Sequence, residues 1–240
     1  MNTHVLIVGL GKARLKLAIA MGNVIAFGIG LWTLLFATSF YWLSLALCFA
    51  IPLAAIALDT VTRGTLDFEA RRRRSPLSLA TLLMVPAIAL GGRAINDLNF
   101  TSYTILLAWT VLAIAAIVTL FLRFDPSLKS DFNQLTTITI FALAWSYGVI
   151  AFADVVLDPS SGRDVPTVIR DKHVHVSGNT KGSSIWRKVA VDPAVVPGGN
   201  PWIEVRPDLY AALARGNTVC VHQGPGLLGA AWYGVGHCKS

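Results

Sequence analysis

Long runs of apolar residues fill the first two thirds of the chain, whereas short alternating runs fill the last third. At a rise of about 1.5 Å per residue, a helix needs about 20 apolar residues to cross a bilayer core of ~30 Å. Five runs of close to this length predict a bundle of five transmembrane helices. The predicted spans are residues 17–37, 41–58, 77–92, 103–122 and 136–154.

The third run, residues 77–92, is the shortest of the five. It contains Pro86 and ends in Gly91 and Gly92. Because proline interrupts helical hydrogen bonding, a second interpretation has four spans. The choice matters, because an even number of spans would return the C-terminal part to the side on which the N-terminus lies.

In the last third, apolar and polar residues alternate between Gly- and Pro-containing turns, as in strands with one buried face. Five short strands predict a small, mainly β domain, either a barrel or a sandwich. The predicted strands are residues 166–176, 184–192, 201–206, 217–223 and 230–238, with a turn at 177–183 and a short helix at 207–214.

Composition supports a division into an N-terminal segment (1–16), a transmembrane part (17–158) and a β-domain (159–240). Charged residues make up 14% of the chain, whereas soluble domains have roughly 25%. Lipid-facing helices explain the deficit, because a charge in hydrocarbon is costly. The stretch Thr136–Asp158 forms the boundary, since the last long apolar run ends there.

The formal net charge is +7, which can indicate nucleic-acid binding, but the basic residues predict membrane topology instead. With the N-terminus in the cytoplasm and five spans, ten basic residues face the cytoplasm and only Arg93 lies in a short outside connector. The ten are Lys12, Arg14, Lys16, Arg63, Arg71, Arg72, Arg73, Arg74, Arg123 and Lys129. The positive-inside rule then places the β-domain in the periplasm of a bacterial inner membrane.

Four consecutive arginines, Arg71 to Arg74, lie in the first long loop. We interpret them as a cytoplasmic signal that sets the topology. A second interpretation, compatible with the first, is a site for anionic lipid headgroups or an acidic partner.

The cysteines provide a separate argument for the periplasm. Cys220 and Cys238 both lie in the β-domain, whereas Cys48 lies in the second span. An even pair in an oxidising compartment predicts a disulfide, worth roughly 3 kcal/mol in the chain-entropy model.

Nitrogen and sulfur donors also allow a metal-site hypothesis. On a strand, side chains two residues apart share a face, as His173 and His175 do. The remaining donors are His222, His237, Cys220 and Cys238. Such a set could bind zinc or copper, but the spacing matches no strong metal motif, and this hypothesis competes with the disulfide for the cysteines.

The sequence contains no recognisable catalytic motif, and we expect no cofactor. GPGLLG (224–229) predicts a hairpin loop and not a phosphate cradle, because no helix follows it. Asp154 and Asp158 flank the end of the fifth span. We interpret them as residues that mark the membrane exit.

Several short motifs are spread over the C-terminal third: Asp158 soon after the last span, WIEVRPDLY (202–210), Gly216–Val219, Gly226–Gly229, Trp232–Tyr233 and a final Cys238. In these the chain resembles the periplasmic β-module that ends many uncharacterised proteobacterial polytopic inner-membrane proteins. The resemblance implies the layout of helices and module, and implies no activity.

These observations predict a non-enzymatic inner-membrane protein. Its β-module would bind a partner protein, or a second copy in a homo-oligomer, or stabilise a membrane assembly, with membrane lipids as its surroundings. Two alternatives from other classes are a periplasmic metal-handling or redox module and a subunit that transports or handles lipids.

Overall fold

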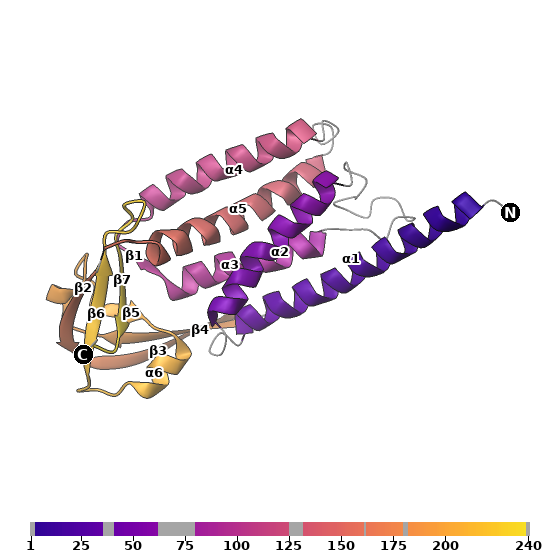
Figure 1. Ribbon diagram of the computed structural model, residues 1–240. Coiled ribbons are helices and arrows are strands. Elements are labelled where there is room, and N and C mark those ends of the chain that lie inside the picture. Colours follow the sequence, from indigo (N-terminus) through magenta and orange to yellow (C-terminus); the bar gives the residue numbers. More distant parts are fainter. Residues whose placement is uncertain are drawn as a thin grey trace. The chain divides into compact units, whose positions relative to one another are not determined.

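The structure is a computed structural model that describes residues 3–35, 41–61, 80–124, 132–160, 162–179 and 182–238. Five long helices lie before all but one of the strands of two small antiparallel sheets, and the remaining short strand lies between the third and fourth helices (Figure 1). The long helices are α1 (Thr3–Leu35), α2 (Tyr41–Val61), α3 (Ala80–Asp97), α4 (Thr104–Phe124) and α5 (Phe132–Val156).

A helix covers the described part of each predicted span, although the bounds differ. Within the described part of the chain, α4 and α5 are long and apolar enough to cross a membrane. Helices α1 and α2 contain shorter apolar stretches, Ile19–Leu35 and Trp42–Ala57.

Polar and small residues fit the apolar helices for local reasons. In α5, the hydroxyls of Thr136, Thr137 and Thr139 each donate to the carbonyl four residues earlier, which satisfies them without water. A Cβ on Gly91 would lie 2.7 Å from the carbonyl oxygen of Ala144. Glycine therefore allows α3 and α5 to approach closely, as small residues do in lipid.

The chain divides into two compact units. The first contains residues 1–92 and 110–149, with a core of seven buried side chains that include Leu83 and Phe141. The second contains residues 93–109 and 150–240. It therefore includes the last turn of α3, the first turns of α4 and the last turns of α5 together with both sheets.

The four-stranded sheet has the order β1-β7-β6-β2, and the three-stranded sheet has the order β3-β4-β5 (Figure 1). The strands are β1 (Asn99–Phe100), β2 (Arg163–Val168), β3 (Asp171–Asn179), β4 (Gly182–Ala190), β5 (Trp202–Glu204), β6 (Thr218–Gly224) and β7 (Trp232–Gly236); a 3₁₀ helix, η2 (Pro193–Val195), and α6 (Pro207–Ala212) complete the unit. Buried residues of both sheets, among them Val189, Ile203, Val219 and Val221, form one hydrophobic cluster. Of the two expected architectures, this is the sandwich.

Three predicted segments differ from the structure. The expected strand 166–176 is two strands, because the chain leaves one sheet for the other at Ile169 and Arg170. Ile169 N–H donates to Asn217 O beside β6, whereas Arg170 N–H donates to Ala190 O on β4. The expected turn 177–183 is also wrong, since β3 continues to Asn179 and β4 begins at Gly182.

The third difference is the connector predicted at 93–102. Helix α3 continues through the first part of this connector and ends at Asp97. Arg93 and Asp97 lie one turn apart and form an ion pair of 3.4 Å that is largely shielded from solvent, which favours the helical conformation there. After one further residue, Asn99 and Phe100 pair with Tyr233 and Trp232 as strand β1. A segment predicted to be a simple connector thus supplies an edge strand of the β-domain.

Candidate functional site

The predicted disulfide is present in the structure. Cys220 lies on β6 and Cys238 lies just after β7, with a Cα–Cα distance of 4.9 Å. The strand register brings them together, because Cys220 lies opposite Gly236.

The predicted metal donors are not brought into one site. His173 and His175 are exposed on β3 of the three-stranded sheet, with ring centroids 6.3 Å apart. His222 lies on β6 of the other sheet, and His237 follows β7. Among the described residues, no three His, Cys, Asp or Glu side chains lie close enough together to hold a metal ion. The run Arg71–Arg74 lies outside the described residues.

Asp154 and Asp158, interpreted from sequence as residues that mark the membrane exit, bind the loop between β6 and β7. We call residues 225–231 the glycine loop. Asp154 is fully buried in the last turns of α5. Its Oδ1 accepts a hydrogen bond of 2.6 Å from the N–H of Leu228, and its backbone carbonyl accepts one of 2.9 Å from the N–H of Leu227. Two successive amides of the loop are therefore held by one residue of the helix.

Asp158 accepts hydrogen bonds from both sides of the loop. Its Oδ2 lies 3.0 Å from the N–H of Gly226 and 3.0 Å from the indole Nε1 of Trp232, and its Oδ1 accepts from the N–H of Ser160. The hydroxyl and N–H of Ser160, followed by the indole and the Gly226 N–H, lower the pKa of Asp158 from 3.8 to about 2. The carboxylate is therefore charged at neutral pH.

Glycines make these contacts possible. Gly226 has φ +76°, a conformation that L side chains rarely adopt. A Cβ there would overlap Asp154 Oδ2 and come within 2.6 Å of the Ala230 carbonyl oxygen. At Gly224 a Cβ would lie 2.5 Å from Trp232 Nε1 and 2.7 Å from Asp158 Oδ2. The aspartates reach the loop backbone because these positions lack side chains.

The connector between α3 and α4 binds the other end of the same loop. Phe100 is 5% exposed and pairs with Trp232. Both the N–H and the hydroxyl of Thr101 donate to the carbonyl of Ala231, at 2.9 and 3.1 Å. The glycine loop is thus held from α5 and from the α3–α4 connector.

A cavity of 350 Å³ opens on the outer face of the four-stranded sheet, beside Asp158. We call it the outer-face cavity; its lining includes Val155, Ser160, Asp164, His222, Trp232 and Gly234. Gly234 lies opposite His222 in the β6–β7 register. A Cβ at Gly234 would meet no atom within 4 Å. The missing side chain leaves space between the imidazole and the indole.

His222 is oriented by Asp164, with 2.5 Å between Nδ1 and Oδ1. We assign the proton to Nδ1, because an ionised carboxylate only accepts hydrogen bonds. The Nε2 atom lies over Gly236, where a Cβ would come within 2.7 Å of it. Ser160 also lines the cavity, but its hydroxyl hydrogen-bonds Asp158. Ser160, His222 and Asp164 are therefore not connected as a hydrolytic triad.

Comparison with protein-family models, with curated proteins and with solved structures finds no match for this chain. The interpretation of the candidate site therefore comes from its geometry in this chain. It consists of the Asp158 and Asp164 carboxylates, the oriented His222 and the Trp232 indole around the outer-face cavity. This cavity can receive a cationic group, but it has no assembled nucleophile.

Sequence reasoning placed Asp154 and Asp158 at the end of a helix but did not find their partners. A usable signal exists: two aspartates four residues apart at the end of the last apolar run, followed later by glycines at 224, 226 and 229. Acceptors and exposed loop amides are complementary, but the sequence does not show that they meet.

Proposed function

We propose that the chain is a multi-pass inner-membrane protein whose β-domain forms a binding platform for a partner protein on the periplasmic side. One observation carries the proposal. The β-domain shares a compact unit with residues 93–109 and 150–156, which end or begin α3, α4 and α5. It is built onto helix ends and is not a separate domain on a flexible linker.

The membrane part of the proposal is supported by what the helices expose. Large apolar side chains such as Val24 at 73%, Leu53 at 42% and Val111 at 63% are open to the surroundings. Apolar surface on this scale favours lipid contact. Five spans, with the ten-to-one distribution of basic residues, put the β-domain outside the cytoplasm. The Cys220–Cys238 disulfide is consistent with that compartment.

The proposed contact for the partner is the outer-face cavity. Asp158 is charged at neutral pH, and the Trp232 indole lies beside it. A carboxylate next to an aromatic ring favours a cationic group, through charge and through cation–π attraction. We therefore propose that a lysine or arginine side chain of the partner enters the cavity.

Gly234→Val tests this proposal, because it fills the cavity at a position where a Cβ meets nothing. The full chain is purified in mild detergent after crosslinking in cells, and the stoichiometry of any bound protein is measured. We expect a partner to co-purify with the wild type. With Gly234→Val the recovered amount of that partner should fall at least about tenfold, the scale of a buried charged contact.

Val168→Ala serves as the matched control, since Val168 is 48% exposed on β2 of the same sheet and does not line the cavity. It should retain the partner. A wild-type protein that purifies as a monomer without a partner would contradict the proposed function. Equal recovery with Gly234→Val would show that the cavity is not the contact.

A further inference from the structure

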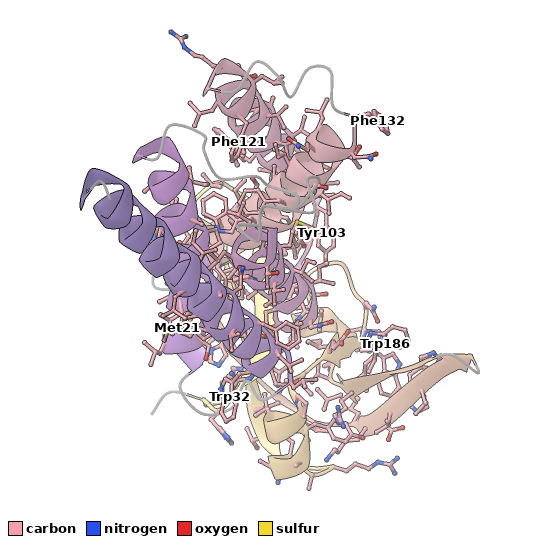
Figure 2. The ribbon with its side chains drawn as sticks, turned by 90° about the vertical axis from the view of Figure 1, so that its right-hand side faces the viewer. Met21, Trp32, Tyr103, Phe121, Phe132 and Trp186 are labelled. Carbon is pink, nitrogen blue, oxygen red and sulfur yellow. A yellow bond between two sulfur atoms is a disulfide. The ribbon has the colours of Figure 1, made fainter. Side chains whose placement is uncertain are left out.

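The β3–β4 hairpin extends beyond the sheet to which it belongs. Nine residue pairs join β3 to β4, whereas β5 pairs only with Lys188, Val189 and Ala190. One residue farther out, the Arg187 carbonyl still accepts a hydrogen bond from the N–H of Val205. Five pairs, from His175–Trp186 to Asn179–Gly182, therefore have no third strand among the described residues. At about 3.4 Å per residue this ribbon is ~17 Å long. Figure 2 shows it projecting, with Trp186 labelled.

A two-stranded ribbon is at best marginally stable in water, and one face of this ribbon is apolar. Val174 is 42% exposed and Val176 is 58% exposed. Both lie on the face that, closer to the sheet, carries the fully buried Val189. The face of the hairpin that packs in the core thus continues beyond the core, where Val174 and Val176 remain exposed among the described residues.

The opposite face carries amphipathic rings. The His175 imidazole stacks on the Trp186 indole with centroids 5.4 Å apart, and His173 meets Trp202 edge-on at 6.0 Å. Indole rings favour the membrane–water interface, because they combine a large apolar area with one N–H donor.

The charge of the hairpin is mainly positive. Residues 171–190 contain four cationic residues, Lys172, Lys181, Arg187 and Lys188, and one acidic residue, Asp171, which forms an ion pair with Arg215. At the base of the hairpin, Lys172 donates to the carbonyls of Tyr210 and Leu213, and Lys188 lies opposite Glu204. Farther out, Arg187 lies opposite Val174, on the apolar face.

We infer that the projecting β3–β4 ribbon lies on the membrane surface and binds anionic lipid headgroups. Val174 and Val176 enter the headgroup–acyl boundary, and Arg187, which lies opposite Val174 on the same face, binds the phosphates. This inference rests on the proposed function, because it requires that the chain be inserted in a bilayer.

Two features favour a lipid surface over a protein partner. An extended peptide added to the free edge of β3 would satisfy its backbone groups, but it would leave the Val174–Val176 face open. An anionic bilayer covers the valines and neutralises Arg187 on the same face, which matches the described side chains of this face.

Site-directed spin labelling of the full chain tests the inference. The protein carries Cys48→Ala, keeps its disulfide, and is reconstituted in nanodiscs of phosphatidylcholine alone or with phosphatidylglycerol. Labels are attached to Val176→Cys on the ribbon, Val168→Cys on β2 and Val111→Cys in α4, whose native side chains are 58%, 48% and 63% exposed. Collision with oxygen, which concentrates in lipid, is compared with collision with a water-soluble nickel complex.

We expect the ratio of oxygen to nickel accessibility at residue 176 to exceed that at residue 168 by at least about fivefold when the lipid is anionic, as for a side chain below the headgroups. Without anionic lipid the ratio should fall, because Arg187 then loses its counter-charge. A ratio that does not depend on lipid charge would overturn headgroup binding.

The three labels separate failure of this inference from failure of the proposed function. If residue 111 is in lipid but residue 176 is in water, the ribbon does not contact the membrane and the inference is wrong. If residue 176 is shielded from both reagents, a protein or a second copy covers it, and the inference is again wrong. If residues 111 and 176 are both in water, the proposed membrane insertion itself fails.

Discussion

At the scale of single residues, Asp158 illustrates how surroundings change the meaning of a side chain. An aspartate just after an apolar helix is an ordinary sign that the chain has left the membrane. Here its two oxygens accept from Ser160, Gly226 and Trp232. A carboxylate with this many donors is stabilised in its charged form, so Asp158 contributes to holding the glycine loop in place.

This leads to a prediction of pH dependence. The folded-state pKa of Asp158 is about 2, below its usual 3.8. A group with a lowered pKa stabilises the fold fully above its unfolded-state pKa and loses that contribution as pH falls through the folded-state value. The thermal midpoint of the wild type should therefore decline between about pH 4 and pH 2.

Asp158→Asn should be less stable than the wild type at pH 7 and should change less across this acid range. Tryptophan fluorescence during heating, at a series of pH values, measures both midpoints. A constant difference between the two proteins from pH 7 to pH 2 would show that Asp158 does not titrate as its hydrogen bonds imply.

At the scale of elements, the glycine loop and strand β1 connect parts of the chain that are far apart in sequence. The loop is bound by Asp154 of α5, by Asp158 just after α5, and by Thr101 of the α3–α4 connector. Because helix ends and loop share these hydrogen bonds, a change in the loop should destabilise the whole second unit.

Two glycine substitutions separate backbone strain from crowding. Gly226 and Gly198 both have positive φ, +76° and +84°. A Cβ at Gly198 meets nothing within 4 Å, whereas one at Gly226 overlaps Asp154 Oδ2. Gly198→Ala should cost about 1 kcal/mol from backbone strain alone, and Gly226→Ala at least about 2 kcal/mol more, because it displaces a buried hydrogen-bonded carboxylate.

Chemical unfolding in detergent, followed through the tryptophans, provides the two free energies. Similar losses in both variants would mean that Asp154 can move away from the loop at little cost. That result would contradict the role assigned to Asp154 here.

At the scale of the whole molecule, the central question about the proposed topology is on which side of the membrane the β-domain and the Arg71–Arg74 loop would lie. Five spans place the Arg71–Arg74 loop and the β-domain on opposite sides, whereas four spans place them on the same side. The basic residues and the disulfide favour the first arrangement.

Limited trypsin digestion should distinguish the two arrangements. In spheroplasts we expect the β-domain to be cleaved and the Arg71–Arg74 loop to be protected, and in inverted vesicles we expect the reverse, because trypsin cannot cross the bilayer. Fragments are identified by mass spectrometry. Cleavage of both regions in the same preparation would support four spans and would contradict a periplasmic β-domain.

Much of the fold could be predicted from local pattern. Each predicted span contains a helix in its described part, and six of the strands, β2 to β7, lie in or beside predicted ones. The crossover at Ile169 was missed, although a signal is present. The apolar phase passes from Val165, Thr167 and Ile169 to Val174 and Val176, that is, from odd to even positions. Such a shift marks a break in a strand.

The candidate site was much less predictable. The cysteine pair was found because two cysteines in one small domain have few possible partners. The partners of Asp154 and Asp158 were not found, because the loop amides that they bind lie 74 and 68 residues farther along the chain. The histidines were grouped by spacing, but spacing does not reveal that β3 and β6 belong to different sheets.

By itself, the sequence determined the five apolar helical segments, the strands of the C-terminal part and the cysteines of the disulfide, because hydrophobic periodicity and composition act over a few neighbouring residues. Only the tertiary structure decided that Asn99–Phe100 is a strand and that Asp154 and Asp158 bind the glycine loop. It also showed that the β3–β4 ribbon projects beyond its sheet. These features depend on which distant backbone donors and strand edges come together when the chain folds, and no local pattern encodes that pairing.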